Sequence, residues 1–85
     1  MPHDILLAAS AFAELESLPD DLQDRLYAHF EQLADNPRMR GTKALAGVPG
    51  GMRIRVGSYR ILYLIDDKNR KVSIYKIGPR RDVYR

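Results

Sequence analysis

The fold is decided by the stretch Met52-Arg-Ile-Arg-Val-Gly-Ser-Tyr-Arg-Ile-Leu-Tyr-Leu-Ile65. Residues 52–56 alternate apolar and basic side chains, which is the pattern of a strand with one buried face. Gly57-Ser58 places glycine first, as a two-residue hairpin turn prefers. Residues 59–65 are apolar apart from one arginine, which is typical of a central strand covered on both faces. We therefore predict two antiparallel strands joined at residues 57 and 58.

A two-residue turn also fixes which side chains share a face. In this register Arg55 lies opposite Arg60, and Arg53 lies opposite Leu62. The other face, which should receive helices, takes the apolar set Met52, Ile54, Val56, Tyr59, Ile61, Tyr63 and Ile65. Like charges directly across a strand pair destabilise a sheet by about 0.2–1 kcal/mol. The arginine cluster therefore favours an anionic ligand, since guanidinium groups match phosphate oxygens with paired hydrogen bonds.

Toward the N-terminus the pattern predicts a short strand at residues 5–7 and then two helices. Residues 8–18 repeat apolar side chains every three or four positions, and Pro19 cannot extend that helix. Asp20 is a suitable N-cap for a second helix, with Gln23 three residues later as in a capping box. Asn36-Pro37 ends the second helix. So short a connection between helices predicts an antiparallel helical hairpin.

The remaining segments complete one sheet. Residues 37–51 hold two prolines and four glycines and are predicted to be irregular. Residues 66–70 form a polar loop, residues 72–77 form the next strand, and residues 80–85 form a charged tail. The predicted fold is α+β: an N-terminal strand, an antiparallel helical hairpin and a three-stranded antiparallel meander in one sheet, with the helices on one face.

Composition limits the class of protein. The chain has 85 residues, no cysteine and a formal net charge of +3. We expect a single domain over residues 1–85, because this length cannot supply a second core. Without cysteine there is no disulfide scaffold, thiolate metal site or cysteine nucleophile. No apolar run approaches the ~20 residues that span a bilayer and no secretory signal is present, so we expect a cytoplasmic protein without membrane contact.

The net charge combines two halves of opposite sign. Residues 1–36 carry eight acidic residues and one basic residue, Arg25, whereas residues 37–85 carry thirteen Lys or Arg and three Asp. The C-terminal half is therefore predicted to bind a polyanion. No metal or other cofactor is expected, and the acidic pair Asp66-Asp67 has the setting of a solvated loop rather than of a metal site.

Three segments of the chain have a characteristic order and spacing. They are Lys43-Ala-Leu-Ala-Gly47, residues 52–66 and Ile77-Gly-Pro-Arg-Arg-Asp-Val-Tyr84. The most specific parts are Arg-x-Gly-x-Tyr-Arg-x-x-Tyr at residues 55–63 and the Arg-Arg-Asp-Val-Tyr ending. Together these segments resemble the RelE/ParE superfamily of toxins from prokaryotic toxin–antitoxin systems, over essentially the whole chain.

The resemblance implies a toxin that is neutralised by a cognate antitoxin protein. RelE-like members are endoribonucleases that cut mRNA on the ribosome and so inhibit translation, without a metal ion or cofactor. ParE-like members instead inhibit DNA gyrase and generally lack the catalytic residues. The leading expectation is an RNA-binding mRNA interferase that acts on mRNA and the ribosome, and the alternative is a non-enzymatic inhibitor of DNA gyrase.

The resemblance also assigns the site residues. The positions that match the family's basic and aromatic site positions are Arg53, Arg55, Arg60, Arg80 or Arg81, and Tyr84. We expect Arg55, Arg60, Arg80 and Tyr84 to be catalytic, and Arg53 and Arg81 to bind RNA. The choice between Arg80 and Arg81 as the catalytic arginine of the tail stays open.

RNA cleavage of this kind needs a base for the ribose 2′-OH, cations for the phosphorane and an acid for the leaving 5′-oxygen. The best-known member has lysines where this chain has Arg53 and Arg55. Arginine is effectively always protonated, so Tyr84 becomes the expected base. Arg60 would then stabilise the phosphorane and Arg80 would lie near the leaving oxygen. Without the resemblance, Tyr84 could equally be an aromatic residue that packs on the core.

Overall fold

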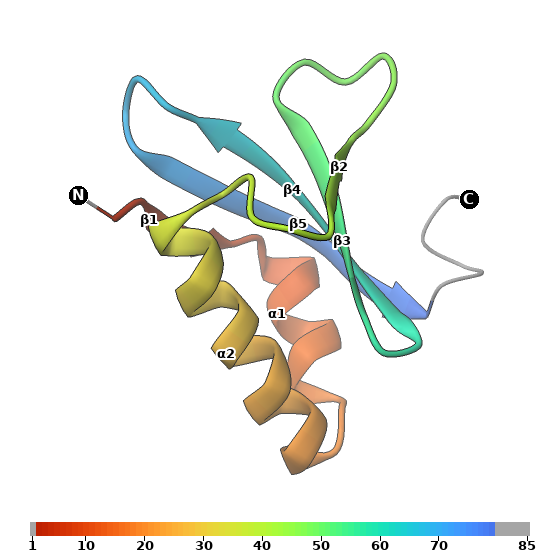
Figure 1. Cartoon of the computed structure of the whole chain (residues 1–85). Helices are drawn as coiled ribbons and strands as arrows, with labels where there is room; N and C mark the ends of the chain where they lie inside the picture. The colour runs from red at the N-terminus through yellow and green to blue at the C-terminus, as the bar shows by residue number, and fades with distance from the viewer. Residues whose placement is uncertain (1, 80–85) are drawn as a thin grey trace.

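A five-stranded sheet carries both helices of the described chain on one of its faces (Figure 1). The computed structural model describes residues 2–79. In chain order the elements are β1 (Asp4–Leu7), α1 (Ala9–Glu16), α2 (Asp20–Asp35), β2 (Thr42–Ala44), β3 (Gly51–Val56), β4 (Tyr59–Asp66) and β5 (Lys71–Pro79). The strand order is β1-β5-β4-β3-β2, with β1 parallel to β5 and the other neighbours antiparallel. The predicted α+β fold is confirmed.

The β3–β4 hairpin has the register that its two-residue turn predicts. Arg55 pairs with Arg60 and Arg53 pairs with Leu62. The opposite face of the hairpin packs into the core, where Ile54, Val56, Ile61 and Tyr63 are buried and Tyr59, Met52 and Ile65 are partly buried. From the helices, the core receives Ala11, Leu15, Leu26, Phe30 and Leu33. The alternation in the sequence therefore separates a core face from a cationic face.

The prediction that residues 37–51 are irregular was wrong for residues 42–44. Residues 42–44 form β2, an edge strand that pairs antiparallel with β3 and places Lys43 opposite Arg53. Three residues are too few to show an alternating pattern, and one of the flanking glycines, Gly41, has a positive φ of 96° that a strand or helix would not use. Pairing with β3, rather than any local preference, therefore makes this segment a strand.

The helices differ from prediction at their ends. Helix α1 covers residues 9–16 rather than 8–18, and Asp20 is the first residue of α2 rather than its N-cap, which is Pro19. The carboxylate of Asp20 instead lies in the first turn, where the helix dipole favours negative charge. The Gln23 side chain does not complete a capping box: its amide donates to the Leu18 carbonyl at 2.8 Å. Neither helix in the described part of the chain is long and apolar enough to cross a membrane.

Strand β5 is longer than predicted and contains a bulge. It extends to Pro79, whereas the sequence pattern suggested an end before Gly78. Leu62 pairs with Lys76, but the next residue of β4 pairs with Ile74, so one extra residue, Tyr75, is accommodated in β5. Ile74 and Ile77 are both buried in the core although they are three positions apart. The bulge therefore leaves Tyr75 and Lys76 on the face away from the helices.

Three segments meet at the end of the sheet beside the β4–β5 turn. The Arg38 guanidinium donates to both carboxylate oxygens of Asp67, at 3.2 and 2.8 Å. His3 lies on the same carboxylate, with Nε2 3.3 Å from Oδ1. The hydrogen bonds from Arg38, and to a smaller extent the contact with His3, hold the pKa of Asp67 below its usual range. The pair is exposed to solvent, so its main effect is to fix the geometry of the loops rather than to add much stability.

Tyr63 joins the core of the sheet to the segment that follows α2. Its side chain is fully buried, and its hydroxyl donates a 2.7 Å hydrogen bond to the carbonyl of Pro37. Burial disfavours the phenolate and raises the pKa of Tyr63 to about 12. The neutral phenol is therefore part of the folded structure.

We expect Tyr63→Phe to lower the free energy of unfolding at pH 8 by about 1 kcal/mol, because the Pro37 carbonyl loses its donor. The wild type should lose further stability as the pH rises from 10 to 12. Over that range the unfolded tyrosine ionises near its usual pKa, whereas the folded one stays protonated up to about pH 12. This loss is on the order of 2 kcal/mol and should be missing from the variant. Denaturant unfolding at several pH values measures both effects.

Tyr27→Phe is the matched control, because Tyr27 is 43% exposed on α2. It should change neither the stability at pH 8 nor its fall at high pH. An equal fall between pH 10 and 12 in the wild type and in Tyr63→Phe would contradict this assignment.

Candidate functional site

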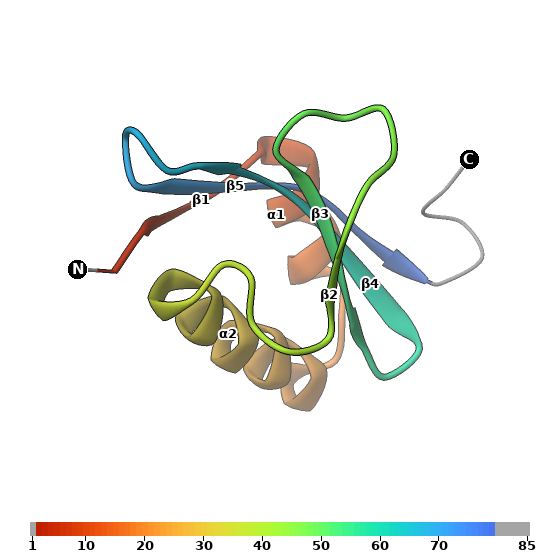
Figure 2. The same ribbon diagram turned by 45° about the horizontal axis from the view of Figure 1, so that its top comes forward.

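One face of the sheet is turned away from the helices (Figure 2). The strand register places cationic side chains from four strands on this face. One row across the strands, given by the register, is Lys43, Arg53, Leu62 and Lys76. The adjacent row is Arg55, Arg60 and Gly78. Neighbouring strands lie about 4.8 Å apart, so the charges of these two rows form one continuous surface. We call this surface the cationic face.

Burial differs among the arginines of the cationic face. Arg60, on the central strand β4, is only 5% exposed, while Arg53 is half-buried and Arg55 is exposed. Leu62 is 6% exposed although no helix covers this face, and it lies between Arg53 and Lys76 in its row. The prediction of a central strand with both faces covered therefore holds for the middle of β4. A guanidinium that is held out of water interacts more strongly with an anion than an exposed one does.

A hollow of about 350 Å³ lies at the β2 side of the cationic face and is lined by Gly41, Lys43, Arg53 and Arg55. The space beside Gly41 is open, since a Cβ built at that position would meet no atom within 4 Å. None of the described lining residues is acidic. Lys43 was not among the predicted site residues, although it opens one of the three segments that carry the family resemblance. Only the pairing of β2 with β3 reveals that Lys43 shares a face with the arginines.

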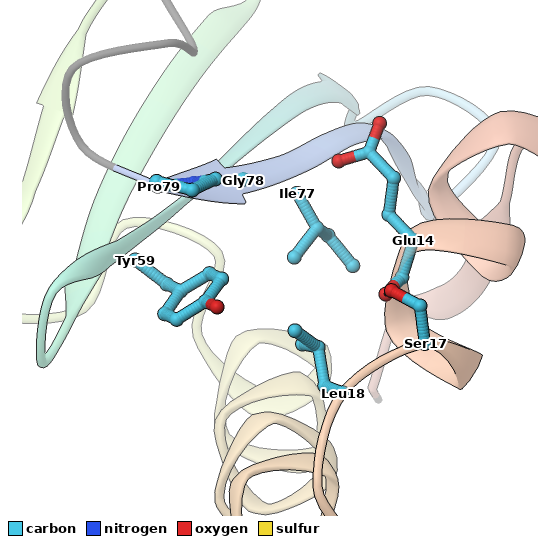
Figure 3. A pocket seen from close by; sticks show the side chains of 7 residues that line it. All are labelled: Glu14, Ser17, Leu18, Tyr59, Ile77, Gly78 and Pro79. Atoms are coloured by element: carbon cyan, nitrogen blue, oxygen red, sulfur yellow. The ribbon is translucent and has the colours of Figure 1, made fainter.

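A second hollow, of about 260 Å³, lies on the helix side of the sheet and has a different chemistry. Its lining residues are Glu14, Ser17, Leu18, Tyr59, Ile77, Gly78 and Pro79. The side chains of Leu18, Tyr59 and Ile77 point toward its interior from three directions (Figure 3). With apolar walls and a carboxylate at the rim, this hollow is unsuited to phosphate. Of these two hollows, the one on the cationic face has the lining that suits an anion.

The structure brings together three of the predicted site residues, Arg53, Arg55 and Arg60. The other three, Arg80, Arg81 and Tyr84, lie outside the described residues. The described chain ends at Pro79, one residue beyond the position that pairs with Arg60. Within residues 2–79, the His, Asp and Glu side chains form no group of three that could hold a metal ion.

Comparison with known proteins gives consistent matches in sequence and structure. Toxin RelG of Mycobacterium tuberculosis is 30% identical over 86 residues, which cover 100% of this chain and 99% of the relative. The archaeal RelE–RelB complex from Pyrococcus horikoshii OT3 contains a chain that superposes with a TM-score of 0.86 at 25% identity, covering 98% of this chain and 100% of that one. A chain of the toxin–antitoxin complex RelBE2 from Mycobacterium tuberculosis gives a TM-score of 0.78 at 29% identity, covering 94% and 100%.

The family model that matches this chain describes the ParE toxin of the type II toxin–antitoxin system parDE, and the match extends over residues 5–84. It includes the cationic face and the tail residues that the sequence assigned to the site. The chain therefore belongs to the ParE toxin family of type II toxin–antitoxin systems, within the RelE/ParE superfamily.

Proposed function

We propose that this toxin is a metal-independent endoribonuclease that cleaves mRNA by attack of a ribose 2′-OH on the adjacent phosphate. The observation that carries the proposal is the cross-strand pair of Arg55 and Arg60, in which Arg60 is almost fully buried at the centre of the cationic face. A buried cation is costly to maintain for stability alone. It is useful where negative charge develops during a reaction.

The chemistry divides among few groups. Arg60 stabilises the charge that develops on the phosphorane, and Arg55, from the neighbouring strand, binds a second oxygen of the same phosphate. Arg53, two positions along β3, holds the RNA backbone. By family resemblance, Tyr84 accepts the proton of the 2′-OH, an arginine of the tail lies near the leaving 5′-oxygen, and Arg81 binds RNA. The products are a 2′,3′-cyclic phosphate and a 5′-hydroxyl end.

A cognate antitoxin is the proposed protein partner, and the two solved relatives described above are both complexes. The strongly basic half of the chain, residues 37–85, would attract an acidic segment of that antitoxin. A segment of this kind can be disordered alone and fold as it binds. Bound over the cationic face, it would exclude RNA.

Inhibition of DNA gyrase is the second candidate, and the match to the ParE toxin model favours it. The two candidates differ in what they require of the cationic face. A nuclease needs Arg60 for turnover, whereas a gyrase inhibitor needs a surface that fits another protein and performs no chemistry.

Two assays with the purified toxin separate these candidates. In the first, mRNA is incubated with the toxin, with and without ribosomes, and the ends of the fragments are identified. Fragments with 2′,3′-cyclic phosphate and 5′-hydroxyl ends are expected, and a requirement for ribosomes would make the ribosome a partner. The second assay follows supercoiling by gyrase, which should be unaffected. Inhibition of supercoiling without RNA cleavage would reject the nuclease and support the alternative.

A further inference from the structure

The hollow beside β2 adjoins the position where we place the reaction and shares Arg55 with it, but it extends toward the edge of the sheet. Lys43 is on the edge strand, and β2 lies two strands away from β4, which carries Arg60. At about 4.8 Å per strand, the backbones of the two strands are about 10 Å apart. The hollow is therefore displaced toward the edge of the sheet from the phosphate that Arg60 would bind.

Charge is concentrated around this hollow by two cross-strand pairs of like sign. Lys43 faces Arg53, and Arg55 faces Arg60, in adjacent rows of the same face. Like charges directly opposite each other destabilise a sheet, whereas an anion between them gains from every one of the four cations. The four side chains therefore form a patch of positive charge that is suited to a polyanion.

The side chains at the hollow are suited to a backbone phosphate rather than to a base. Lys43 is exposed, and its ammonium group is a compact charge that binds phosphate from many directions. None of the four lining residues, Gly41, Lys43, Arg53 and Arg55, is an aromatic residue on which a base could stack. Contacts to phosphate position a nucleic acid without reading its sequence.

We propose that the hollow formed by Gly41, Lys43, Arg53 and Arg55 binds a phosphate of single-stranded RNA next to the phosphate that is cleaved, with Lys43 as a further RNA-binding residue. The inference rests on the proposed function, in that it assumes an RNA substrate on the cationic face. The RNA backbone would then run across the strands, from β5 and β4 toward β2. Lys43 orients the substrate and takes no part in proton transfer.

The test uses a single-stranded 2′-O-methyl oligoribonucleotide, which lacks the attacking hydroxyl and stays intact during the measurement. Its affinity is measured at several salt concentrations for the wild type and for Lys43→Gln. Losing one phosphate contact should make the slope of log K against log salt shallower by about 0.7. The ratio of wild-type to variant affinity should therefore fall about 2.6-fold between 50 and 200 mM salt, for every sequence tested.

Two further variants serve as controls. Lys43→Arg keeps the charge and should retain the wild-type slope. Lys68→Gln removes one charge from the β4–β5 turn, outside the hollow, and should also retain it. Thermal unfolding checks that each variant is folded, which we expect because Lys43 and Lys68 are both exposed.

The outcomes separate this inference from the nuclease proposal. Equal slopes for wild type and Lys43→Gln would overturn the phosphate site even if the wild type cleaves RNA. A slope that depends on Lys43 in a protein that cleaves no RNA would support the site and reject the nuclease. If the wild type does not bind the oligonucleotide at all, the inference is wrong together with the RNA substrate.

Discussion

Arg60→Ala is expected to lower the kcat of RNA cleavage by about 10²–10³-fold, the effect of removing one donor that stabilises charge in a transition state. Arg60 is 5% exposed and pairs across the sheet with Arg55, so its charge acts on the substrate with little screening by water. Affinity for intact RNA should change much less than kcat, because other cations of the cationic face still hold the backbone. Single-turnover cleavage and binding of the 2′-O-methyl oligonucleotide measure the two effects separately.

The burial of Arg60 requires a check on folding. Removing a buried side chain leaves a cavity, and the alanine variant should have a lower melting temperature. Arg60→Lys keeps a cation and most of the volume, and we expect it to retain more activity than Arg60→Ala. Lys68→Ala, in the β4–β5 turn, should cleave at the wild-type rate. Wild-type cleavage by a folded Arg60→Ala protein would contradict the role given to Arg60.

Tyr84→Phe should lower the cleavage rate by about 10²–10⁴-fold, the usual contribution of a general base. The substitution removes the phenolic oxygen that would accept the 2′-OH proton and keeps the aromatic ring. If Tyr84 served only as an aromatic residue packed on the core, phenylalanine would preserve that role and the cleavage rate. The rate under single-turnover conditions, measured from pH 6 to pH 9, tests the assignment.

The control for Tyr84→Phe is Tyr27→Phe, which removes a hydroxyl from the exposed side of α2. It should leave cleavage unchanged across the same pH range. A Tyr84→Phe protein as active as the wild type would exclude Tyr84 as the base. The base would then have to come from another group, since arginine stays protonated under these conditions.

The hairpin could be predicted residue by residue because two independent signals agree there. The alternation of residues 52–56 selects the faces, and the turn at Gly57-Ser58 selects the register. The separation of Arg53 and Arg55 from the core follows directly. The same reasoning could not detect the bulge at Tyr75. An extra residue in one strand becomes visible only when the register with the neighbouring strand is known.

Features that depend on contacts between distant segments of the chain could not be predicted from the sequence. Strand β2 exists because β3 is beside it, so Lys43 could not be placed on the cationic face from local pattern. The contact of Arg38 with Asp67 joins residues 29 positions apart, and nothing in either segment indicates it. The N-cap of α2 is Pro19, so Asp20 lies one position later than expected, in the first turn of the helix.

The candidate site was predictable in part. Family resemblance supplied the roles, and the register placed Arg53, Arg55 and Arg60 on one face, as the structure has them. The hollow, and the presence of Lys43 in its lining, could be recognised only in the three-dimensional structure. The roles of Arg80, Arg81 and Tyr84 still rest on the resemblance. Substituting them is therefore more informative about the site than substituting the arginines that the register already places on one face.

The measurement that tests the central claim most directly is the mapping of RNA 5′-ends in cells after brief induction of the toxin. We predict new 5′-hydroxyl ends within mRNAs for the wild type, and few or none for an Arg60→Ala protein produced at the same level. Unchanged RNA ends in cells that are arrested by the wild-type toxin, with DNA-damage signalling instead, would contradict the nuclease and identify a gyrase inhibitor.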